Sequence, residues 1–355
     1  MQKFNVYVAE KRYNDYSLER EIIEEAGGKL LFAHCREEDD IIAQCSDAHA
    51  ILLRQTPMGD KAFKELTELC VVSRYGVGYD NINIPAATRY GVLVTIVPDY
   101  CVGEVADHTI ALLLSLVRKI PLRDRFVRLG SWDLGDDYPV YRTNGRILGL
   151  VGYGRTAREV RKRLSGFPFR FVAYDPLVAT HVFSADDTEK VDFPTLIRIS
   201  DYVSVHTPLN EHTYHLFNSH TFCTMKRSAI LVNTSRGSVV DTKALYTALK
   251  DSHIAGAALD VYETEPFDTL HPLNTLNNII LSDHAAWYSE ESQKELQMRT
   301  ALEAVRVFTG RLPENPVNPE VLRSTQWKIC SKESRNVKIL SEIPGKKVTQ
   351  LEKVL

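Results

Sequence analysis

The chain has 355 residues, a net charge of −3, 44% hydrophobic residues and 25% charged residues. This composition is ordinary for soluble globular protein, and the length favours roughly two domains. The small net charge argues against binding to nucleic acid or to a membrane surface.

The N-terminal sequence lacks the basic and apolar regions of a secretory signal, and the longest apolar stretch, residues 110–117, is too short to span a bilayer. The six cysteines form no CxxC pair, and without an export signal we expect reduced thiols. The sequence therefore predicts a cytoplasmic protein, and no residue pattern suggests a metal site.

The first hundred residues alternate between strand and helix patterns, which predicts a small parallel α/β domain. Strands are expected at 4–8, 50–53, 71–73 and 92–94, and helices at 18–26 and from Pro85 to the turn at Gly91. A helix over 103–119 follows, and its apolar residues occupy more than one face. Such a helix is expected to be buried between domains or subunits.

The alternation restarts near Arg146 and predicts a doubly wound sheet. Its six strands are expected at 147–151, 170–174, 202–206, 229–233, 255–259 and 278–281. A helix over about 290–309 is expected to return to the first domain. Beyond about residue 320 the chain is polar and rich in Lys and Arg, which indicates a solvated tail or an oligomer arm, with an anion-binding arm as the alternative.

The strand at 147–151 runs into a glycine turn and a helix, the context of a dinucleotide-binding fingerprint. Gly152 would make the tight turn, Gly154 would let a pyrophosphate approach, and Ala157 would let the helix pack closely. Asp175, 21 residues beyond Gly154, would accept hydrogen bonds from ribose hydroxyls. Its carboxylate would repel a 2′-phosphate and no arginine follows it, so NAD is favoured over NADP.

Three later strands end in residues suited to acid–base chemistry on a carboxylic acid. Arg236 follows one strand, Glu265 lies a few residues beyond the next, and His284 follows the third. His284 would donate a proton to a keto oxygen, and Glu265 would favour the imidazolium form. The planar guanidinium of Arg236 would bind a carboxylate or polarise the carbonyl.

The chain resembles the D-isomer-specific 2-hydroxyacid dehydrogenase family over nearly all of residues 1–320. The resemblance is carried by the glycine fingerprint, by His284 and by segments 76–82, 233–237 and 260–266. It is most similar to the branch of the C-terminal binding proteins. That branch shares the form of segment 284–290, and Leu209-Asn210-Glu211-His212 and Arg74 also fit it.

The resemblance implies a role for each site residue. The catalytic set would be Arg236, Glu265 and His284. The cofactor would contact Thr109, Gly152, Tyr153, Gly154, Arg155, Thr156, Asp175, Thr207, Pro208, Thr234 and Asp260, with Asp260 near the nicotinamide carboxamide. The substrate would contact Arg74, Val77, Gly78, Arg236 and Trp287. Gly76 and Gly78 free the backbone to form an anion-binding nest for the substrate carboxylate.

The resemblance also implies two doubly wound parallel-sheet α/β domains with a cleft between them. A flavodoxin-like substrate-binding domain would comprise 1–100 and 290–320, a Rossmann NAD domain would comprise 101–289, and 321–355 would form a C-terminal extension. Closure of the cleft would exclude water. A homodimer is expected, with the helix near 103–118 at its interface, and no nucleic-acid or membrane partner.

The leading hypothesis is an NAD-dependent D-2-hydroxyacid dehydrogenase that acts mainly as a 2-keto acid reductase. One alternative is an NAD(H)-sensing binding protein, like the transcriptional corepressors of the C-terminal binding protein branch. Another is a phosphoglycerate- or hydroxypyruvate-type dehydrogenase, although its usual regulatory domains are missing and Trp287 suggests a pocket less suited to phosphate. Asp283 stands where the family commonly has proline, which leaves the pH optimum open.

Overall fold

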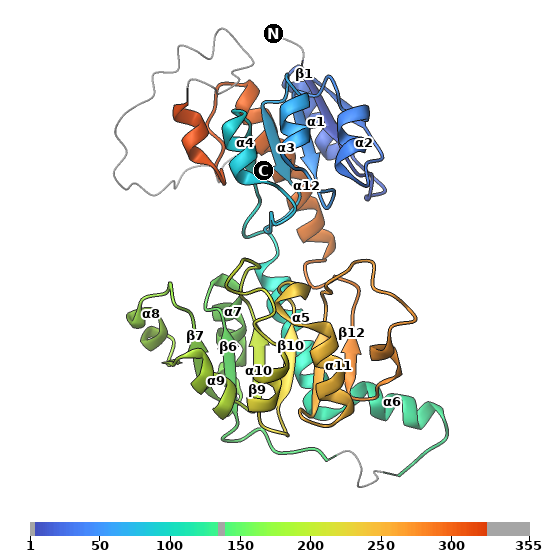
Figure 1. The fold of residues 1–355 in the computed structure, drawn as a ribbon, viewed down its shortest axis with the longest axis vertical. Coiled ribbons are helices and arrows are strands. Elements are labelled where there is room, and N and C mark those ends of the chain that lie inside the picture. The colour runs from blue at the N-terminus through green and yellow to red at the C-terminus, as the bar shows by residue number, and fades with distance from the viewer. Residues whose placement is uncertain (1–3, 134–138, 325–355) are drawn as a thin grey trace. The chain divides into compact units, whose positions relative to one another are not determined.

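The computed structural model describes residues 4–133 and 139–324. The chain divides into two compact units, which Figure 1 shows as ribbons. Unit 1 contains the residues up to Pro98 and those from Lys294 onward, and unit 2 is Asp99–Gln293. The predicted boundaries after residues 100 and 289 therefore differ from the observed divisions by two and four residues. Most of the predicted extension, 321–355, lies outside the described residues.

Unit 1 is built on a five-stranded parallel sheet of order β2-β1-β3-β4-β5. The strands are β1 (Phe4–Val8), β2 (Gly28–Phe32), β3 (Ala50–Leu53), β4 (Val71–Arg74) and β5 (Leu93–Thr95). The helices are α1 (Ser17–Glu25), α2 (Glu38–Gln44), α3 (Asp60–Glu65) and α4 (Ile84–Arg89), with η4 (Pro319–Arg323) near the end. This strand order is that of flavodoxin-like sheets, so the predicted fold of the first domain is confirmed.

Helix α12 (Glu290–Phe308) carries the chain back into unit 1. Within unit 1 its Gln297 side chain donates hydrogen bonds to the buried Glu19 carboxylate on α1, at 2.9 and 3.1 Å, and the Tyr75 hydroxyl donates a third at 2.9 Å. Burial of the carboxyl group raises the pKa of Glu19, and this effect outweighs the hydrogen bonds from Gln297 and Tyr75, which lower it. The returning helix is thus joined to α1 and to the end of the sheet through one buried carboxyl group.

Unit 2 contains a seven-stranded parallel sheet of order β12-β11-β10-β9-β6-β7-β8, which follows the Rossmann pattern around β6. The strands are β6 (Ile147–Val151), β7 (Arg170–Tyr174), β8 (Glu189–Lys190), β9 (Tyr202–Val205), β10 (Ile230–Asn233), β11 (Gly256–Leu259) and β12 (Ile279–Leu281). The helices are α5 (Val102–Arg118), α6 (Ile120–Arg128), α7 (Arg155–Arg163), α8 (Thr180–Ala185), α9 (Phe193–Ile199), α10 (Ser219–Thr224) and α11 (Thr242–Lys250), with short turns η1 (Leu164–Gly166), η2 (Gly237–Val239) and η3 (Pro272–Thr275). The predicted doubly wound sheet is confirmed.

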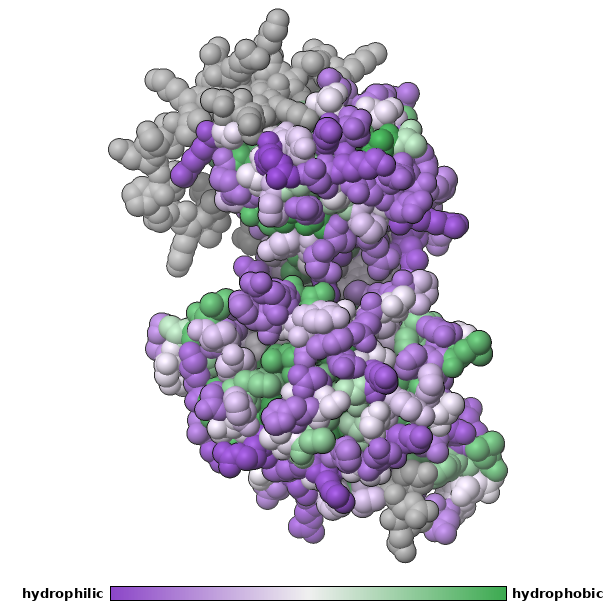
Figure 2. Space-filling model, in the orientation of Figure 1, coloured by the Kyte–Doolittle hydropathy of each residue, from purple (hydrophilic) through white to green (hydrophobic). Residues whose placement is uncertain are grey.

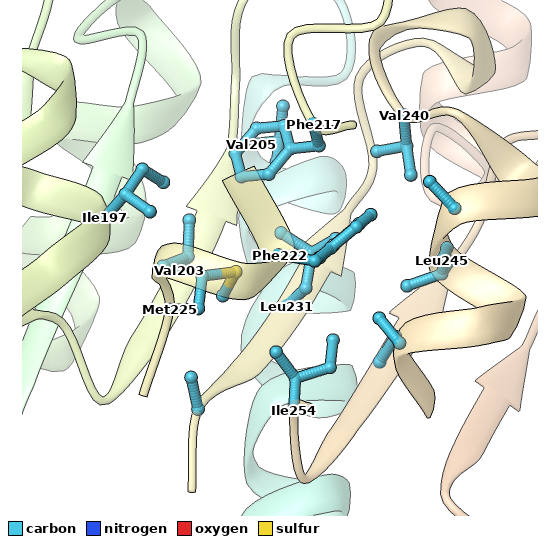
Figure 3. Close-up of a cluster of buried hydrophobic side chains, with 14 of the residues drawn as sticks. Ile197, Val203, Val205, Phe217, Phe222, Met225, Leu231, Val240, Leu245 and Ile254 are labelled. Carbon is cyan, nitrogen blue, oxygen red and sulfur yellow. The ribbon is translucent and has the colours of Figure 1, made fainter. Parts of the chain in front are cut away.

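Alternate residues of the central strands of unit 2 enter two separate cores. In β10, Leu231 packs into one core, and Ile230 and Val232 pack into the other. Figure 3 shows the first core, where Phe222 and Leu245 from α10 and α11 lie over the sheet. Burial on both faces explains why these strands are continuous apolar runs.

Helix α5 uses its apolar residues inside unit 2. Leu113, Leu116 and Val117 are buried in the second core together with residues of β6 and α7. The apolar character of this helix is therefore explained by packing within one unit, and the expectation that it marks a domain or subunit interface is not needed.

One cysteine differs from the expectation. Among the described residues Cys35, Cys45 and Cys223 are free thiols, but Cys70 is disulfide-bonded, so the expectation of six reduced thiols is wrong at this position. Spacing alone cannot reveal which cysteines approach one another in the fold.

None of the helices in the described part of the chain is long and apolar enough to cross a membrane.

Candidate active site

The turn between β6 and α7 has the geometry that the fingerprint predicts. Gly152 has φ +87°, and a Cβ there would lie 2.8 Å from the carbonyl group of His206. Gly154 begins α7, and no heavy atom of the described residues lies within 4 Å of where its Cβ would stand. No described side chain caps the first N–H groups of α7. The turn is therefore tightly packed at Gly152 and open at Gly154.

Asp175 follows β7, and its side chain contacts the backbone of this turn. One carboxylate oxygen accepts a hydrogen bond from the Tyr153 N–H at 2.9 Å, and the other accepts one from the Leu177 N–H at 2.9 Å. A carboxylate has about four acceptor positions, so some remain for a ligand. The Tyr153 side chain is buried, stacks on Phe183 and hydrogen-bonds to Asp186 and Thr188, which leaves only its backbone to the turn.

The loop that carries Arg236 is shaped by Asn233 at the end of β10. The Asn233 amide donates to the Arg236 carbonyl at 2.9 Å, and its oxygen accepts from the N–H and the hydroxyl of Ser235. The next residue, Gly237, packs directly on the backbone after β11. A Cβ at Gly237 would lie 1.8 Å from the carbonyl carbon of Tyr262. Only glycine can therefore bring the Arg236 loop this close to the segment that leads to Glu265.

Glu265 and His284 form a hydrogen-bonded pair. The ring nitrogen Nδ1 of His284 lies 2.7 Å from Oε2 of Glu265, and Oε1 accepts from the Tyr262 N–H at 3.1 Å. Since a carboxylate can only accept, Nδ1 carries the proton and leaves Nε2 for a ligand. Burial favours the neutral acid, but the bond from His284 and the charges of His284 and Arg236 outweigh it and lower the pKa of Glu265. Two of the three predicted catalytic residues, Glu265 and His284, are thus hydrogen-bonded in unit 2, which also contains Arg236.

The backbone on either side of His284 is held by buried groups. His284 has φ +57°, which is unusual for a residue with a side chain. The carboxylate of Asp260, 1% exposed, accepts from the N–H groups of Ala285 and Ala286 at 2.9 and 3.0 Å. The Tyr262 hydroxyl donates to the Ser282 carbonyl at 2.8 Å. These bonds fix the direction in which the His284 ring points.

Known proteins are similar to this chain in sequence and in fold. The family model described as D-isomer specific 2-hydroxyacid dehydrogenase, NAD binding domain, matches residues 110–286. The glyoxylate reductase of Korarchaeum cryptofilum is 40% identical over 288 residues, 80% of this chain and 86% of that protein.

The chain belongs to the D-isomer specific 2-hydroxyacid dehydrogenase family.

Two further members extend the comparison. The D-3-phosphoglycerate dehydrogenase of Methanocaldococcus jannaschii is 35% identical over 84% of this chain, which spans 56% of that protein. A crystal structure of a glyoxylate reductase from Paecilomyes thermophila has a TM-score of 0.79 at 26% identity, covering 90% of this chain and 99% of that one. The protein is an NAD-dependent dehydrogenase of this family.

The turn after β6 fits the NAD of this dehydrogenase family. The open position beside Gly154 and the uncapped N–H groups of α7 together offer donors and space for a diphosphate. Asp175 keeps acceptor positions for hydroxyl groups and brings a negative charge that disfavours a 2′-phosphate. Thr207 lies against Gly152, because its N–H nitrogen is 2.9 Å from the position of a Cβ there.

The remaining predicted contacts have different surroundings. Thr109 is fully buried, and its hydroxyl donates to the Val105 carbonyl. It also bonds to the Thr234 hydroxyl at 2.8 Å, so Thr109 lies on the interior side of Thr234. Trp287 lies in unit 2, with its ring 6.2 Å from that of Tyr100. In unit 1, the Arg74 guanidinium donates to the Tyr75 carbonyl at 2.6 Å.

The loop after β4 in unit 1 keeps the open form expected of an anion-binding nest. Gly76 has φ +130°, and Val77 is 43% exposed. Among the described hydrogen bonds, none is donated by the N–H groups of Val77 or Gly78. Both groups are therefore free to bind an anion from solution.

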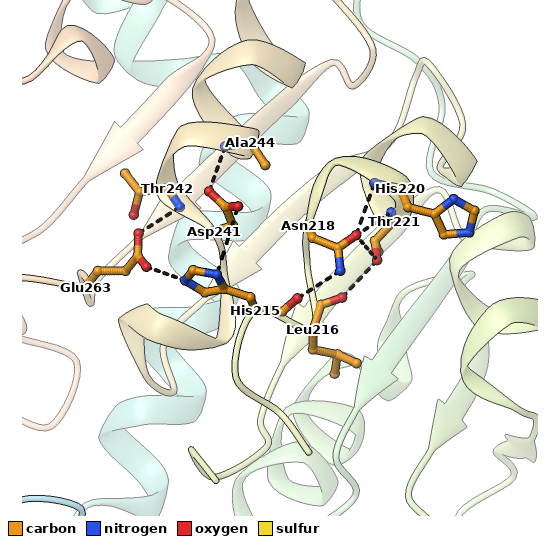
Figure 4. A network of polar contacts seen from close by, with 9 residues as sticks. All are labelled: His215, Leu216, Asn218, His220, Thr221, Asp241, Thr242, Ala244 and Glu263. Carbon is orange, nitrogen blue, oxygen red and sulfur yellow. Dashed lines mark hydrogen bonds and ion pairs between the residues drawn. The ribbon is translucent and has the colours of Figure 1, made fainter. Parts of the chain in front are cut away.

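A second polar network in unit 2 was not predicted from the sequence. Figure 4 shows His215 between Glu263 and Asp241; its Nε2 lies 2.5 Å from Glu263 and its Nδ1 4.0 Å from Asp241. Glu263 also accepts from the Thr242 N–H at 2.9 Å. Burial is outweighed by Thr242 and His215, so the pKa of Glu263 is lowered. His215 and Glu263 are 48 positions apart in the sequence, so no short-range pattern connects them.

Proposed function

We propose that the protein reduces a small 2-keto acid to the D-2-hydroxy acid, with NADH as the reductant. The observation that carries this proposal is the His284–Glu265 pair, 2.7 Å apart, in a unit built as a nucleotide-binding domain. Arg236 lies near enough to lower the pKa of Glu265. An imidazolium, a carboxylate and a guanidinium together suit the protonation of a keto oxygen beside a carboxylate group.

Each member of this set has one role in the proposal. His284 donates the proton from Nε2 to the carbonyl oxygen during reduction and removes it in the reverse direction. Glu265 holds the ring at Nδ1 and stabilises its positive charge. Arg236 binds the substrate carboxylate and polarises the carbonyl. When bound, NADH supplies the hydride.

We propose that the cofactor is bound around the glycine turn. The N–H groups of Arg155 and Thr156 and the backbone of Gly152, Tyr153 and Gly154 hold the diphosphate. Asp175 accepts from the adenosine ribose, and Thr207 and Pro208 border the adenine. Thr234 faces the cofactor with Thr109 supporting it from behind, and the acceptor position left on Asp260 serves the nicotinamide carboxamide.

For the substrate we propose a carboxylate site on the loop after β4. The free N–H groups of Val77 and Gly78 bind the carboxylate as an anion-binding nest, and Arg74 adds a positive charge. Trp287 contributes an apolar wall, which favours an uncharged substituent on the keto acid over a phosphate.

The relatives favour a glyoxylate-like substrate. The glyoxylate reductase of Thermofilum pendens is 38% identical, and this chain spans 86% of it. The phosphoglycerate dehydrogenase alternative is also compatible with the family, since the D-3-phosphoglycerate dehydrogenase of Archaeoglobus fulgidus is 36% identical over 79% of this chain. The likeness to the C-terminal binding proteins, carried by segments 284–290 and 209–212 and by Arg74, stays a prediction.

The test is NADH oxidation at 340 nm with glyoxylate, pyruvate, hydroxypyruvate, a branched 2-keto acid and a phosphorylated 2-keto acid. We expect the highest kcat/KM on glyoxylate or hydroxypyruvate and a D-configured product wherever the product is chiral. A preference for the phosphorylated acid would favour the phosphoglycerate-type alternative. An L-configured product would contradict the proposal.

We also propose that the protein is a homodimer, and the surface of α6 and the following segment supports this. Several large apolar side chains there are exposed: Ile120, Val127, Leu129, Trp132 and Tyr141. Hydrophobic residues are visible at the surface over α6 in Figure 2. An exposed apolar patch of this kind is typical of a subunit interface. A second copy of the chain is the partner that this patch would bury.

A further inference from the structure

Two consecutive residues of α5 contact the two loops that carry the proposed catalytic groups. Thr109 bonds to Thr234, two residues before Arg236. The neighbouring His108 places its Nε2 3.0 Å from the Ser282 hydroxyl, two residues before His284. The His108 side chain is 28% exposed.

The direction of the hydrogen bonds follows from the donors available. The Ser282 hydroxyl donates to Oδ1 of Asp260 at 2.7 Å. Because the single hydroxyl proton of Ser282 is donated to Asp260, the Ser282 oxygen can only accept a hydrogen bond from His108. Nε2 of His108 must carry a hydrogen, whether the ring is neutral or protonated.

The same carboxylate oxygen holds the backbone beside His284. Oδ1 of Asp260 accepts from both Ser282 and the Ala285 N–H, and Oδ2 accepts from the Ala286 N–H. Nε2 of His108 also lies 3.5 Å from Oδ1 of this buried carboxylate. A chain of contacts thus runs from His108 through Ser282 and Asp260 to the residues that follow His284.

We propose that His108 is a positioning residue for the reaction, which acts through Ser282 and Asp260 to hold the His284 ring in its productive direction. This inference rests on the proposed function of His284. His108 touches neither the reacting atoms nor His284 in the contacts described, so its influence must pass through the backbone of Ala285 and Ala286. An imidazole displaced by about 1 Å loses on the order of 100-fold in rate.

The experiment compares His108→Leu, which removes the donor, with His108→Gln, whose amide can place an N–H near the former Nε2. His181→Leu on α8 is the control, because His181 is exposed and lies far from this chain of contacts in sequence. Steady-state kcat and KM for the keto acid, the NADH Kd and the thermal midpoint are measured for each. We expect His108→Leu to lower kcat about 10- to 100-fold with KM little changed, and His108→Gln to recover most of the loss.

Ser282→Ala and the double variant H108L/S282A distinguish positioning from general destabilisation. Because both residues lie on one path, the double variant should lose no more kcat than the worse single variant. Three results would overturn the inference. The first is a double variant whose loss of kcat is the product of the two single losses. The others are a wild-type kcat in His108→Leu and equal losses of kcat in His108→Leu and His108→Gln. If His108→Leu does not fold, Ser282→Ala and His108→Gln carry the same comparison.

A readout without turnover separates this inference from the proposed function. The 15N NMR spectrum of the His284 ring, assigned by loss of its signals in His284→Ala, reports the hydrogen bond at Nδ1. We expect His108→Leu to change these signals and His181→Leu to leave them unchanged. Absence of turnover in the wild type would defeat the proposed function, and unchanged ring signals in His108→Leu would defeat the positioning role.

Discussion

Glu265 has two partners that make it an ionised acceptor under most conditions. His284 and the Tyr262 N–H both donate to it, and its pKa is lowered despite burial. The carboxylate therefore stays charged as the pH falls through the weakly acidic range. Protonation of Glu265 should not limit the rate near neutral pH.

Glu265→Gln should lower kcat about 100-fold, because a neutral amide stabilises an imidazolium much less than a carboxylate does. Steady-state kcat measures the loss, with Glu263→Gln as a neighbour that does not bond to His284. An unchanged kcat in Glu265→Gln would show that the carboxylate of Glu265 does not support His284 in the reaction.

Asp201 lies immediately before β9, at the end of the unit 2 sheet opposite to the proposed site, and stabilises that end. Its side chain, 7% exposed, accepts from the Ile147 N–H and pairs with Arg146 and Lys226 at 2.9 and 3.0 Å. Burial is outweighed by these three partners, so the pKa of Asp201 is lowered. A lowered pKa in the folded state stabilises the fold above the ordinary carboxyl value of about 3.9, and the contribution is lost as the pH falls through the folded value.

Asp201→Asn should therefore reduce the free energy of unfolding by about 1–3 kcal/mol at neutral pH and by much less in acid. Urea unfolding of both proteins at several pH values measures this difference. The exposed Asp251, at the end of α11, provides the control substitution Asp251→Asn. A destabilisation that is the same at all pH values would contradict the charge-based explanation.

At the level of residues, the sequence revealed groups with a fixed place in a motif. Arg236, Glu265 and His284 were predicted because each follows a strand in a nucleotide-binding fold, and the structure places a hydrogen bond between Glu265 and His284. His215 and His108 were not predicted, because their partners are distant in sequence and a lone histidine has no pattern. The buried partners of Asp260 could be known only from the fold.

The glycine turn before α7 allows a sharp test at the level of one element. Gly154 has φ −77°, and a Cβ there meets none of the described atoms. Gly154→Ala should therefore fold normally and yet weaken NADH binding, since the methyl group enters the space proposed for the diphosphate. Fluorescence titration with NADH and a thermal melt measure the two effects.

Gly166→Ala is the matched control, because that glycine also has open space around its Cβ position and lies after the same helix. It should change neither measurement. Gly152→Ala should weaken both binding and stability, because the φ of +87° and the His206 backbone both oppose a side chain. Normal NADH affinity in Gly154→Ala would mean that the cofactor does not pass beside this residue.

Among the elements, strands as short as β5 and β12 were predicted, whereas β8 and β2 were not. All six strands expected in unit 2 are present, but β8 has only two residues, too few for a period to be visible. In unit 1, β2 was missed because Gly27 and Gly28 were assigned to the end of a helix. The strand begins at Gly28, where a Cβ would lie 2.5 Å from the Phe4 ring.

For the whole molecule, the apolar patch on α6 and the following segment leads to a prediction about assembly. Leu129 is 72% exposed, and a charge there would be costly to bury against a second copy. Leu129→Asp should convert the dimer to a monomer, as measured by light scattering on the eluting protein. Leu270→Asp, at a site that is 88% exposed and lies before η3, should leave the mass unchanged. A wild-type protein that elutes as a monomer would contradict the proposal.

The plan of two parallel-sheet units was also predictable, because the βα alternation stops and restarts along the chain. The arrangement of cysteines was not, as Cys70 shows. The substrate is the property that the sequence predicts least, since the size of a pocket depends on side chains brought together only by the fold.

The central claim is that this NAD-dependent dehydrogenase reduces a 2-keto acid with His284 as the proton donor. The most direct test is NADH oxidation at 340 nm on glyoxylate and its homologues by the wild type and by His284→Ala, with the NADH Kd measured for both. We predict turnover by the wild type, a loss of at least about 100-fold in the variant, and a similar Kd for both proteins. Tight NADH binding without turnover on any keto acid would contradict the claim and favour a protein that senses the cofactor without using it.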